Sequence, residues 1–213
     1  MKLYKFRPLT NIERLLDIVL EERLYCAHFE DLNDPFEGVY LSRHHMPGWL
    51  GSAGTTVVRR KSVAALRGFE QVSRVCSLSA SFADLRLWAH YADGHKGVAV
   101  EIDFTGHEAD LFPIEYLTEL PQHADQTVLG TPFADQILTK KTIHWEYENE
   151  HRILQSQPYY SVEGRVTAVL LGSRIDQKLK SLLSKAFGEN VCLLETFINE
   201  QTLAIEIPSQ DDA

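Results

Sequence analysis

The sequence predicts an α+β domain with a mixed, mainly antiparallel β-sheet core and flanking helices. Two patterns favour this class: short apolar runs with a period of two, and apolar residues at helical spacing between several of those runs. The composition, 44% hydrophobic and 24% charged, suits a soluble globular core. The chain has 213 residues and no internal repeat, low-complexity tract or linker that would divide it, so we expect one domain over residues 1–213.

The first half of the chain alternates predicted strands and helices. A capping-box pattern at residues 10–13 marks the first helix, and Gly94 ends the helix that carries Trp88. Two histidines, one proline and three glycines without a clear period indicate an irregular excursion at 41–56. In order, we predict strands at 3–6 and 24–29, a helix within 57–70, a strand at 74–79, a helix at 85–92 and a strand at 96–104.

The second half is expected to end in a strand, a helix and a strand. Apolar residues at helical spacing run from Ile175 to Phe187 and stop at Gly188, between two β-rich runs. In order, we predict a strand near 111–116, a helix near 132–141, strands at 148–154 and 165–171, a helix at 175–187, a strand at 191–198 and its hairpin partner at 203–207.

Charge and apolar content exclude some function classes. The net charge of −9 repels phosphate backbones unless a local basic patch outweighs it, so nucleic acid is a disfavoured partner. No apolar run is long enough to span a bilayer and no signal pattern opens the chain, so we expect a cytoplasmic protein. Three scattered cysteines in apolar surroundings, Cys26, Cys76 and Cys192, are interpreted as reduced core thiols.

Two carboxylates and a guanidinium share one face of the strand predicted at 148–154. A period of two places Glu148, Glu150 and Arg152 together. Two carboxylates in one cleft raise the pKa of one of them, while Arg152 would hold the other ionised, which separates an acid role from a base role. The alternative is a solvated strand face with a cross-linked ion pair.

Two other segments carry polar and aromatic groups suited to a ligand. On a helix Trp88 and Tyr91 are neighbours, and with His90 they could stack on a flat ligand or simply belong to the core. Asn33 and Asp34, fixed by the following proline, could hold a ribose or only form a turn. His144, Glu148 and His151 would suit a metal only on a helix, and the strand interpretation separates them, so no metal site is predicted.

Several of these motifs resemble the bacterial domain-of-unknown-function 2971 family. The resemblance runs in the family's order through nearly the whole chain. The matching stretches are 3–6, 32–37, 76–79, 87–98, 145–153 and 170–172.

The order of elements is also similar to a distant ADP-ribosyltransferase core. That resemblance implies a split sheet and NAD as substrate, with Glu150 as the catalytic carboxylate. In the leading hypothesis, Glu148 and Arg152 orient Glu150. The resemblance implies that Tyr4 or Arg7 contacts the cofactor, that Ser77 and Ser79 line the strand beneath it, and that Tyr91 stacks on nicotinamide. Asn33, Asp34, Trp88 and His90 join the predicted binding residues because of their own chemistry.

Three functions remain open at this point. The first is an NAD-consuming transferase or glycohydrolase, whose acceptor the sequence does not name. The second is a non-catalytic ligand- or protein-binding regulatory domain, as in phage defence or stress response. The third is nucleotide hydrolysis by the paired carboxylates with a divalent ion.

Overall fold

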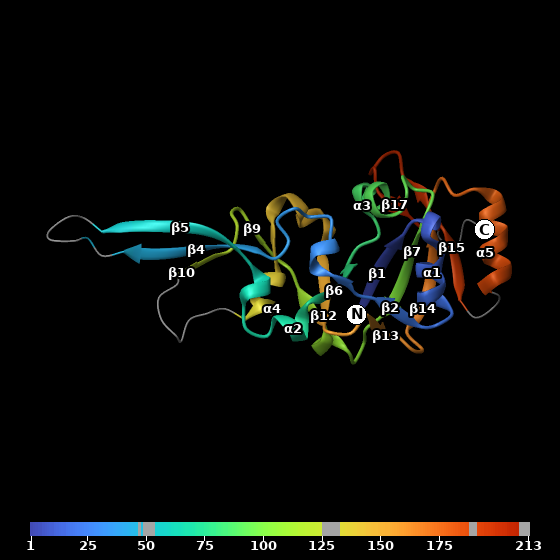
Figure 1. The fold of residues 1–213 in the computed structure, drawn as a ribbon. Helices are drawn as coiled ribbons and strands as arrows, with labels where there is room; N and C mark the ends of the chain where they lie inside the picture. Colours follow the sequence, from blue (N-terminus) through green and yellow to red (C-terminus); the bar gives the residue numbers. More distant parts are fainter. Residues whose placement is uncertain (47, 49–53, 125–132, 188–190, 209–213) are drawn as a thin grey trace.

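An eight-stranded mixed sheet forms the centre of the molecule (Figure 1). The computed structural model describes residues 1–46, 48, 54–124, 133–187 and 191–208. The strand order is β15-β14-β7-β1-β6-β12-β8, with β3 paired to β6, and every pair is antiparallel except β14 with β15. The strands are β1 (Lys2–Arg7), β3 (Ala27–His28), β6 (Arg74–Ser79), β7 (Val98–Asp103), β8 (Phe112–Pro113), β12 (Glu150–Gln155), β14 (Val166–Leu171) and β15 (Cys192–Glu195).

This sheet consists of two halves joined at one residue pair. Strands β1 and β7 pair along their full length from Lys2 to Arg7, and β6 and β12 pair along theirs from Arg74 to Ser79. Between the halves, β1 and β6 are paired only through Tyr4 and Ser79. The strands are not paired beyond that point, which leaves room for side chains and a cavity between the half-sheets.

Helices cover both faces of the β1 half-sheet. Helices α1 (Ile12–Val19) and α5 (Gln177–Phe187) contribute to a core that includes Leu3 of β1. Helix α3 (Leu85–Tyr91) packs on the opposite face, where Trp88 meets Tyr4 and Phe6. The alternation of β1 therefore divides its apolar side chains between two cores.

A third, smaller core lies beside the β6 half-sheet. It combines Phe29, Tyr40 and Val75 with the short helices α2 (Phe69–Val72) and α4 (Ala134–Leu138). Five 3-10 turns connect the described elements: η1 (Leu9–Asn11), η2 (Phe29–Asp31), η3 (Val63–Ala65), η4 (Glu108–Asp110) and η5 (Ile143–Glu148).

A long hairpin projects from this end of the molecule (Figure 1). Strands β4 (Val39–Met46) and β5 (Thr55–Ser62) form it, and β10 (Gln122–Ala124) pairs with the base of β4. The remaining strands form three small pairs: β2 (Arg23–Tyr25) with β13 (Tyr159–Ser161), β9 (Glu115–Leu117) with β11 (Lys140–Thr142), and β16 (Phe197–Ile198) with β17 (Ile205–Glu206).

The predicted fold class is confirmed, and so is the strand-helix-strand ending, in which β14 and β15 are parallel as a helical crossover requires. The irregular excursion at 41–56 and the helix at 57–70 are wrong, because cross-strand pairing makes most of the described part of 39–62 a hairpin. Asn11 precedes α1, but no side chain caps that helix. Cys26 and Cys76 are buried and free, whereas Cys192 is exposed and is not a core thiol.

No helix within the described ranges is long and apolar enough to cross a bilayer.

Candidate functional site

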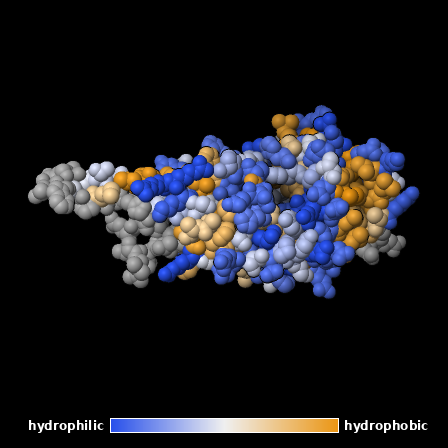
Figure 2. Space-filling model, in the orientation of Figure 1, coloured by the Kyte–Doolittle hydropathy of each residue, from blue (hydrophilic) through white to orange (hydrophobic). Residues whose placement is uncertain are grey.

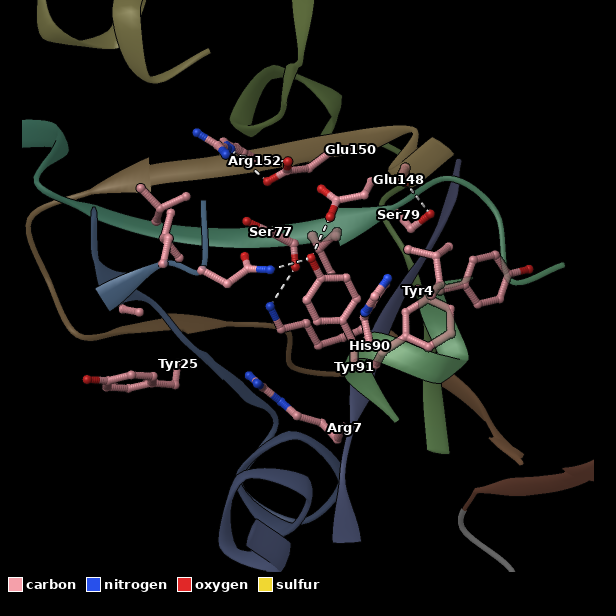
Figure 3. A pocket seen from close by; sticks show the side chains of 18 of the residues that line it. Tyr4, Arg7, Tyr25, Ser77, Ser79, His90, Tyr91, Glu148, Glu150 and Arg152 are labelled. Atoms are coloured by element: carbon pink, nitrogen blue, oxygen red, sulfur yellow. Dashed lines mark hydrogen bonds and ion pairs between the residues drawn. The ribbon is translucent and has the colours of Figure 1, made fainter. Parts of the chain in front are cut away.

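A cavity of about 380 Å³ lies between the two half-sheets, beside the Tyr4–Ser79 junction. That volume falls within the range of about 300–1,000 Å³ typical of small-molecule sites. Figure 3 shows its side chains converging from β1, β6, β12 and α3. The polar and aromatic residues that line it are Tyr4, Lys5, Phe6, Arg7, Tyr25, Asp31, Asn33, Glu37, Ser77, Ser79, His90, Tyr91, Lys141, Glu148, Glu150 and Arg152.

Two cations from β1 form one wall of the cavity. Lys5 and Arg7 are two residues apart on the strand and therefore project from the same face. Lys5 Nζ donates a hydrogen bond to the Ser77 carbonyl, 2.6 Å away, across the gap between the half-sheets. Burial lowers the pKa of both side chains, and Arg7 Nε is buried without a hydrogen-bond partner among the described residues. A buried donor of this kind is costly unless a ligand accepts its hydrogen bond.

A hydrogen-bonded chain crosses the cavity to the other half-sheet. Asn33 Nδ2 donates to the Tyr91 hydroxyl at 2.9 Å, and that hydroxyl donates to Glu148 Oε1 at 2.5 Å. Figure 3 shows Tyr91 between Arg7 and Glu148. Burial and the charge of Glu148 raise the pKa of Tyr91, so its hydroxyl keeps its proton and remains a donor.

Glu148 is one end of a buried network of alternating charges. Lys141 Nζ lies 2.5 Å from Glu148 Oε2 and 3.0 Å from Glu150 Oε2. Arg152 Nε donates to Glu150 Oε1 at 2.7 Å, and its two terminal nitrogens donate to both oxygens of Glu37 at 2.6 and 2.7 Å. All five residues are buried. Three carboxylates therefore face two cations, which leaves one negative charge in excess.

In this network the pKa values of the two central carboxylates, Glu148 and Glu150, shift in opposite directions. Burial is the main cause that raises the pKa of Glu148, and together with the nearby charge of Glu150 it outweighs the lowering effect of Lys141. Burial also acts on Glu150, but Arg152, Lys141 and a hydrogen bond from Ser77 hold its pKa below the ordinary value. One carboxylate thus stays ionised while its neighbour accepts protons more readily, as the sequence predicted for such a pair.

A left-handed residue brings the two carboxylates together. Glu148 is the last residue of η5, Asn149 has a φ of 43°, and β12 begins at Glu150. Asparagine tolerates this conformation better than most residues because its short side chain can bond locally. The prediction that Glu148 lies on the strand is therefore wrong, although its side chain still meets that of Glu150 through Lys141.

Ser79 fixes the junction from which the cavity opens. Its Oγ lies 2.6 Å from the Glu148 carbonyl and accepts a hydrogen bond from the Ser81 amide at 3.1 Å. Across the junction, the Tyr4 hydroxyl donates to Glu101 at 3.0 Å. The hydroxyls of both junction residues are therefore engaged within the protein.

Most of the predicted site residues meet in this cavity. Asp34 and Trp88 are not among those that line it. Trp88 is fully buried against Phe6, at a ring distance of 5.3 Å, and its indole nitrogen donates to the Phe82 carbonyl. Asp34 is buried and accepts a hydrogen bond from the Phe36 amide, which is a turn contact. Trp88 is therefore a core aromatic residue, and Asp34 forms a turn, as the alternative interpretations of these residues predicted.

Sequence reasoning missed five polar residues of the site, namely Lys5, Tyr25, Asp31, Glu37 and Lys141. Lys5 interrupts an apolar strand, a signal that could have found it. Tyr25 lies in the strand predicted at 24–29, and Glu37 ends the stretch 32–37 that contains Asn33 and Asp34. Lys141 follows another lysine in an unremarkable stretch, and only the tertiary structure links it to Glu148.

The described part of the chain has no cluster of three or more histidine, cysteine, aspartate or glutamate residues able to hold a metal ion. No family model, curated protein or solved structure matches this chain. The similarities to the domain-of-unknown-function 2971 family and to ADP-ribosyltransferases therefore stay predictions.

Proposed function

We propose that the cavity binds NAD and that the protein breaks the bond between nicotinamide and ribose, as a transferase or a glycohydrolase. The observation that carries this proposal is the polarity of the cavity. Lys5 and Arg7 line the cavity from β1, and Glu148 and Glu150 line it from the other half-sheet. Figure 3 shows Arg7 on the opposite side of Tyr91 from Glu148. NAD has the matching polarity, because it carries an anionic diphosphate at its centre and a cationic nicotinamide ring at one end.

The two carboxylates suit different steps of that reaction. When the glycosidic bond breaks, its electron pair leaves with nicotinamide, and positive charge develops on the ribose. Glu150, whose pKa is held low, is ionised and would stabilise this charge. Glu148, whose pKa is raised, would take the proton of the acceptor hydroxyl or water as the new bond to ribose forms. Tyr91 and His90 would contact the nicotinamide ring.

A binding domain without catalysis is the second candidate. Both oxygens of Glu150 already contact cations, Arg152 at Oε1 and Lys141 at Oε2. A carboxylate so fully paired has less charge to offer a developing cation. The same cavity would then hold a nucleotide and report its presence to a partner protein.

The test is to incubate the purified protein with NAD and to measure released nicotinamide and the thermal shift caused by NAD. We expect release by the wild type, a loss of about 100-fold or more in Glu150→Gln, and a smaller loss in Glu148→Gln that depends on pH. The matched control is Glu163→Gln, an exposed carboxylate outside the cavity, which should release nicotinamide at the wild-type rate.

The outcomes separate the candidates. A thermal shift with NAD but no release by any variant would leave the binding domain as the function. The absence of both a thermal shift with NAD and nicotinamide release would overturn both NAD proposals. Equal release by the wild type and a folded Glu150→Gln variant would exclude Glu150 as the catalytic carboxylate.

A further inference from the structure

Acidic and basic residues are distributed unevenly along the chain. Residues 38–69 contain none of the 30 acidic residues of the chain. The same segment holds five Lys and Arg residues, namely Arg43, Arg59, Arg60, Lys61 and Arg67. Four of the five lie on the hairpin of β4 and β5, which we call the basic arm (Val39–Met46 and Thr55–Ser62). An acidic protein thus carries a local basic surface.

The basic arm presents arginines on both of its faces. Arg43, Arg59 and Arg60 are exposed. Arg59 lies opposite Ser42 and projects from one face of the hairpin. Arg60, opposite Leu41, and Arg43, opposite Val58, project from the other face, because residues paired across strands share a side. Figure 2 shows strongly hydrophilic side chains along this arm, beside apolar ones.

The outer part of the basic arm is narrow and uncharged. Strand β10 pairs with β4 from Leu41 to Arg43, and beyond Arg43 the described residues of the arm form a two-stranded ribbon. Its exposed residues there include Met46, Thr55 and Thr56. Each strand has 8 residues and spans about 26 Å at roughly 3.3 Å per residue. Figure 1 shows the arm extending away from the rest of the molecule.

We propose that the basic arm binds double-stranded DNA, with the ribbon in the major groove and its arginines on the flanking phosphates. The major groove of B-form DNA, about 12 Å wide, admits a two-stranded ribbon and has phosphates along both sides. Cations on both faces of the arm match that arrangement. A membrane is flat and would engage one face, and the major groove of duplex RNA is too narrow for side chains to read.

The net charge of −9 does not oppose this contact at close range. At physiological salt, charges separated by more than about 8 Å are largely screened, so the arginines of the arm dominate the field that a phosphate meets there. Sequence reasoning disfavoured nucleic acid on the net charge alone, and the hairpin that segregates the basic residues became visible only in the fold.

The basic arm begins beside the cavity. Asn33 and Glu37 line the cavity, and β4 starts at Val39. The Arg60 guanidinium lies 5.6 Å from the centre of the Phe36 ring, between the two features. The base of the arm therefore adjoins the cavity, and its outer ribbon extends away from it. DNA binding by the basic arm does not depend on the reaction proposed for the cavity.

The test is fluorescence anisotropy of the full chain with a labelled 20-base-pair DNA duplex at several salt concentrations. We expect Arg43→Gln/Arg59→Gln/Arg60→Gln to weaken binding at least tenfold. We also expect the slope of log affinity against log salt to fall by about 2 to 3, because each lost phosphate contact contributes about 0.9. The matched control, Lys96→Gln/Lys178→Gln/Lys185→Gln, removes the same charge from exposed sites elsewhere and should bind like the wild type.

Four results would overturn the proposal: no binding by the wild type at micromolar protein, equal weakening in both triple variants, tighter binding to duplex RNA than to DNA, or binding confined to anionic phosphatidylserine vesicles. Thermal melting checks that both variants are folded. Because all six substituted side chains are exposed, melting temperatures should stay close to that of the wild type.

Discussion

Lys141 Nζ lies 2.5 Å from Glu148 Oε2, and both side chains are buried at the wall of the cavity. The lysine comes from β11, whereas the carboxylate ends η5, so the contact fixes the turn that precedes β12. Lys141 also contacts Glu150, which makes it the only described cation that bridges the two central carboxylates. Buried pairs of this kind add little net stability, since desolvation offsets their attraction, but losing one partner is costly.

Substituting Lys141 should therefore destabilise the fold strongly. We expect Lys141→Met to lower the free energy of unfolding by about 3–5 kcal/mol, because it leaves two buried carboxylates without their shared cation. The adjacent Lys140 provides the control. It pairs with Glu115, whose side chain is 61% exposed, so Lys140→Met should cost less than about 1 kcal/mol. Urea denaturation measures both, and equal costs would contradict the structural role assigned to Lys141.

The two carboxylates should affect the pH dependence of stability in opposite directions. The folded pKa of Glu150 is below 4.5, so its stabilisation is present above that pH and is lost as the pH falls. The folded pKa of Glu148 is above 4.5, so its stabilisation is present in acid and is lost as the pH rises through that pKa.

Denaturation of three proteins across about pH 3–7 tests this assignment. Glu150→Gln should lose less stability than the wild type below about pH 4.5, and Glu148→Gln should lose less as the pH rises from about 4.5 towards neutrality. Identical pH profiles for the two variants would show that the carboxylates do not titrate separately.

Arg7 should matter for binding more than for stability. Its Nε is buried without a partner among the described residues, and burial lowers its pKa, so the folded state gains little from the charge. We expect Arg7→Met to leave the free energy of unfolding unchanged or to raise it by about 1–3 kcal/mol. The thermal shift caused by NAD should fall below one tenth of the wild-type shift at the same concentration. A large loss of stability in Arg7→Met would indicate that Arg7 holds the fold together instead.

The spacing of apolar residues correctly predicted those strands and helices whose apolar side chains are buried in the folded protein. The strand at 74–79 and the helix before Gly188 appear where alternation and helical spacing indicated. The hairpin of β4 and β5 was missed because its strands gain their partners from each other and from β10, and because the two histidines near the end of β4 and the glycines that follow hide the alternation. Element boundaries at Glu148 and Glu150 depended on a left-handed Asn149 that no period reveals.

The sequence by itself determined the fold class and three of the segments that line the cavity: Asn33 with its turn, Tyr91 with its helix, and the Glu148–Arg152 stretch. Only the tertiary structure decided that Lys141 joins the two carboxylates, that Trp88 belongs to the core, and that the sheet divides beside Tyr4 and Ser79. The physical reason is the sequence distance between the interacting residues. Turn chemistry and periodicity act between neighbouring residues, whereas burial and strand pairing join residues that are far apart in the chain. The contacts of Lys141 span seven and nine residues across an irregular turn, where no period relates the partners.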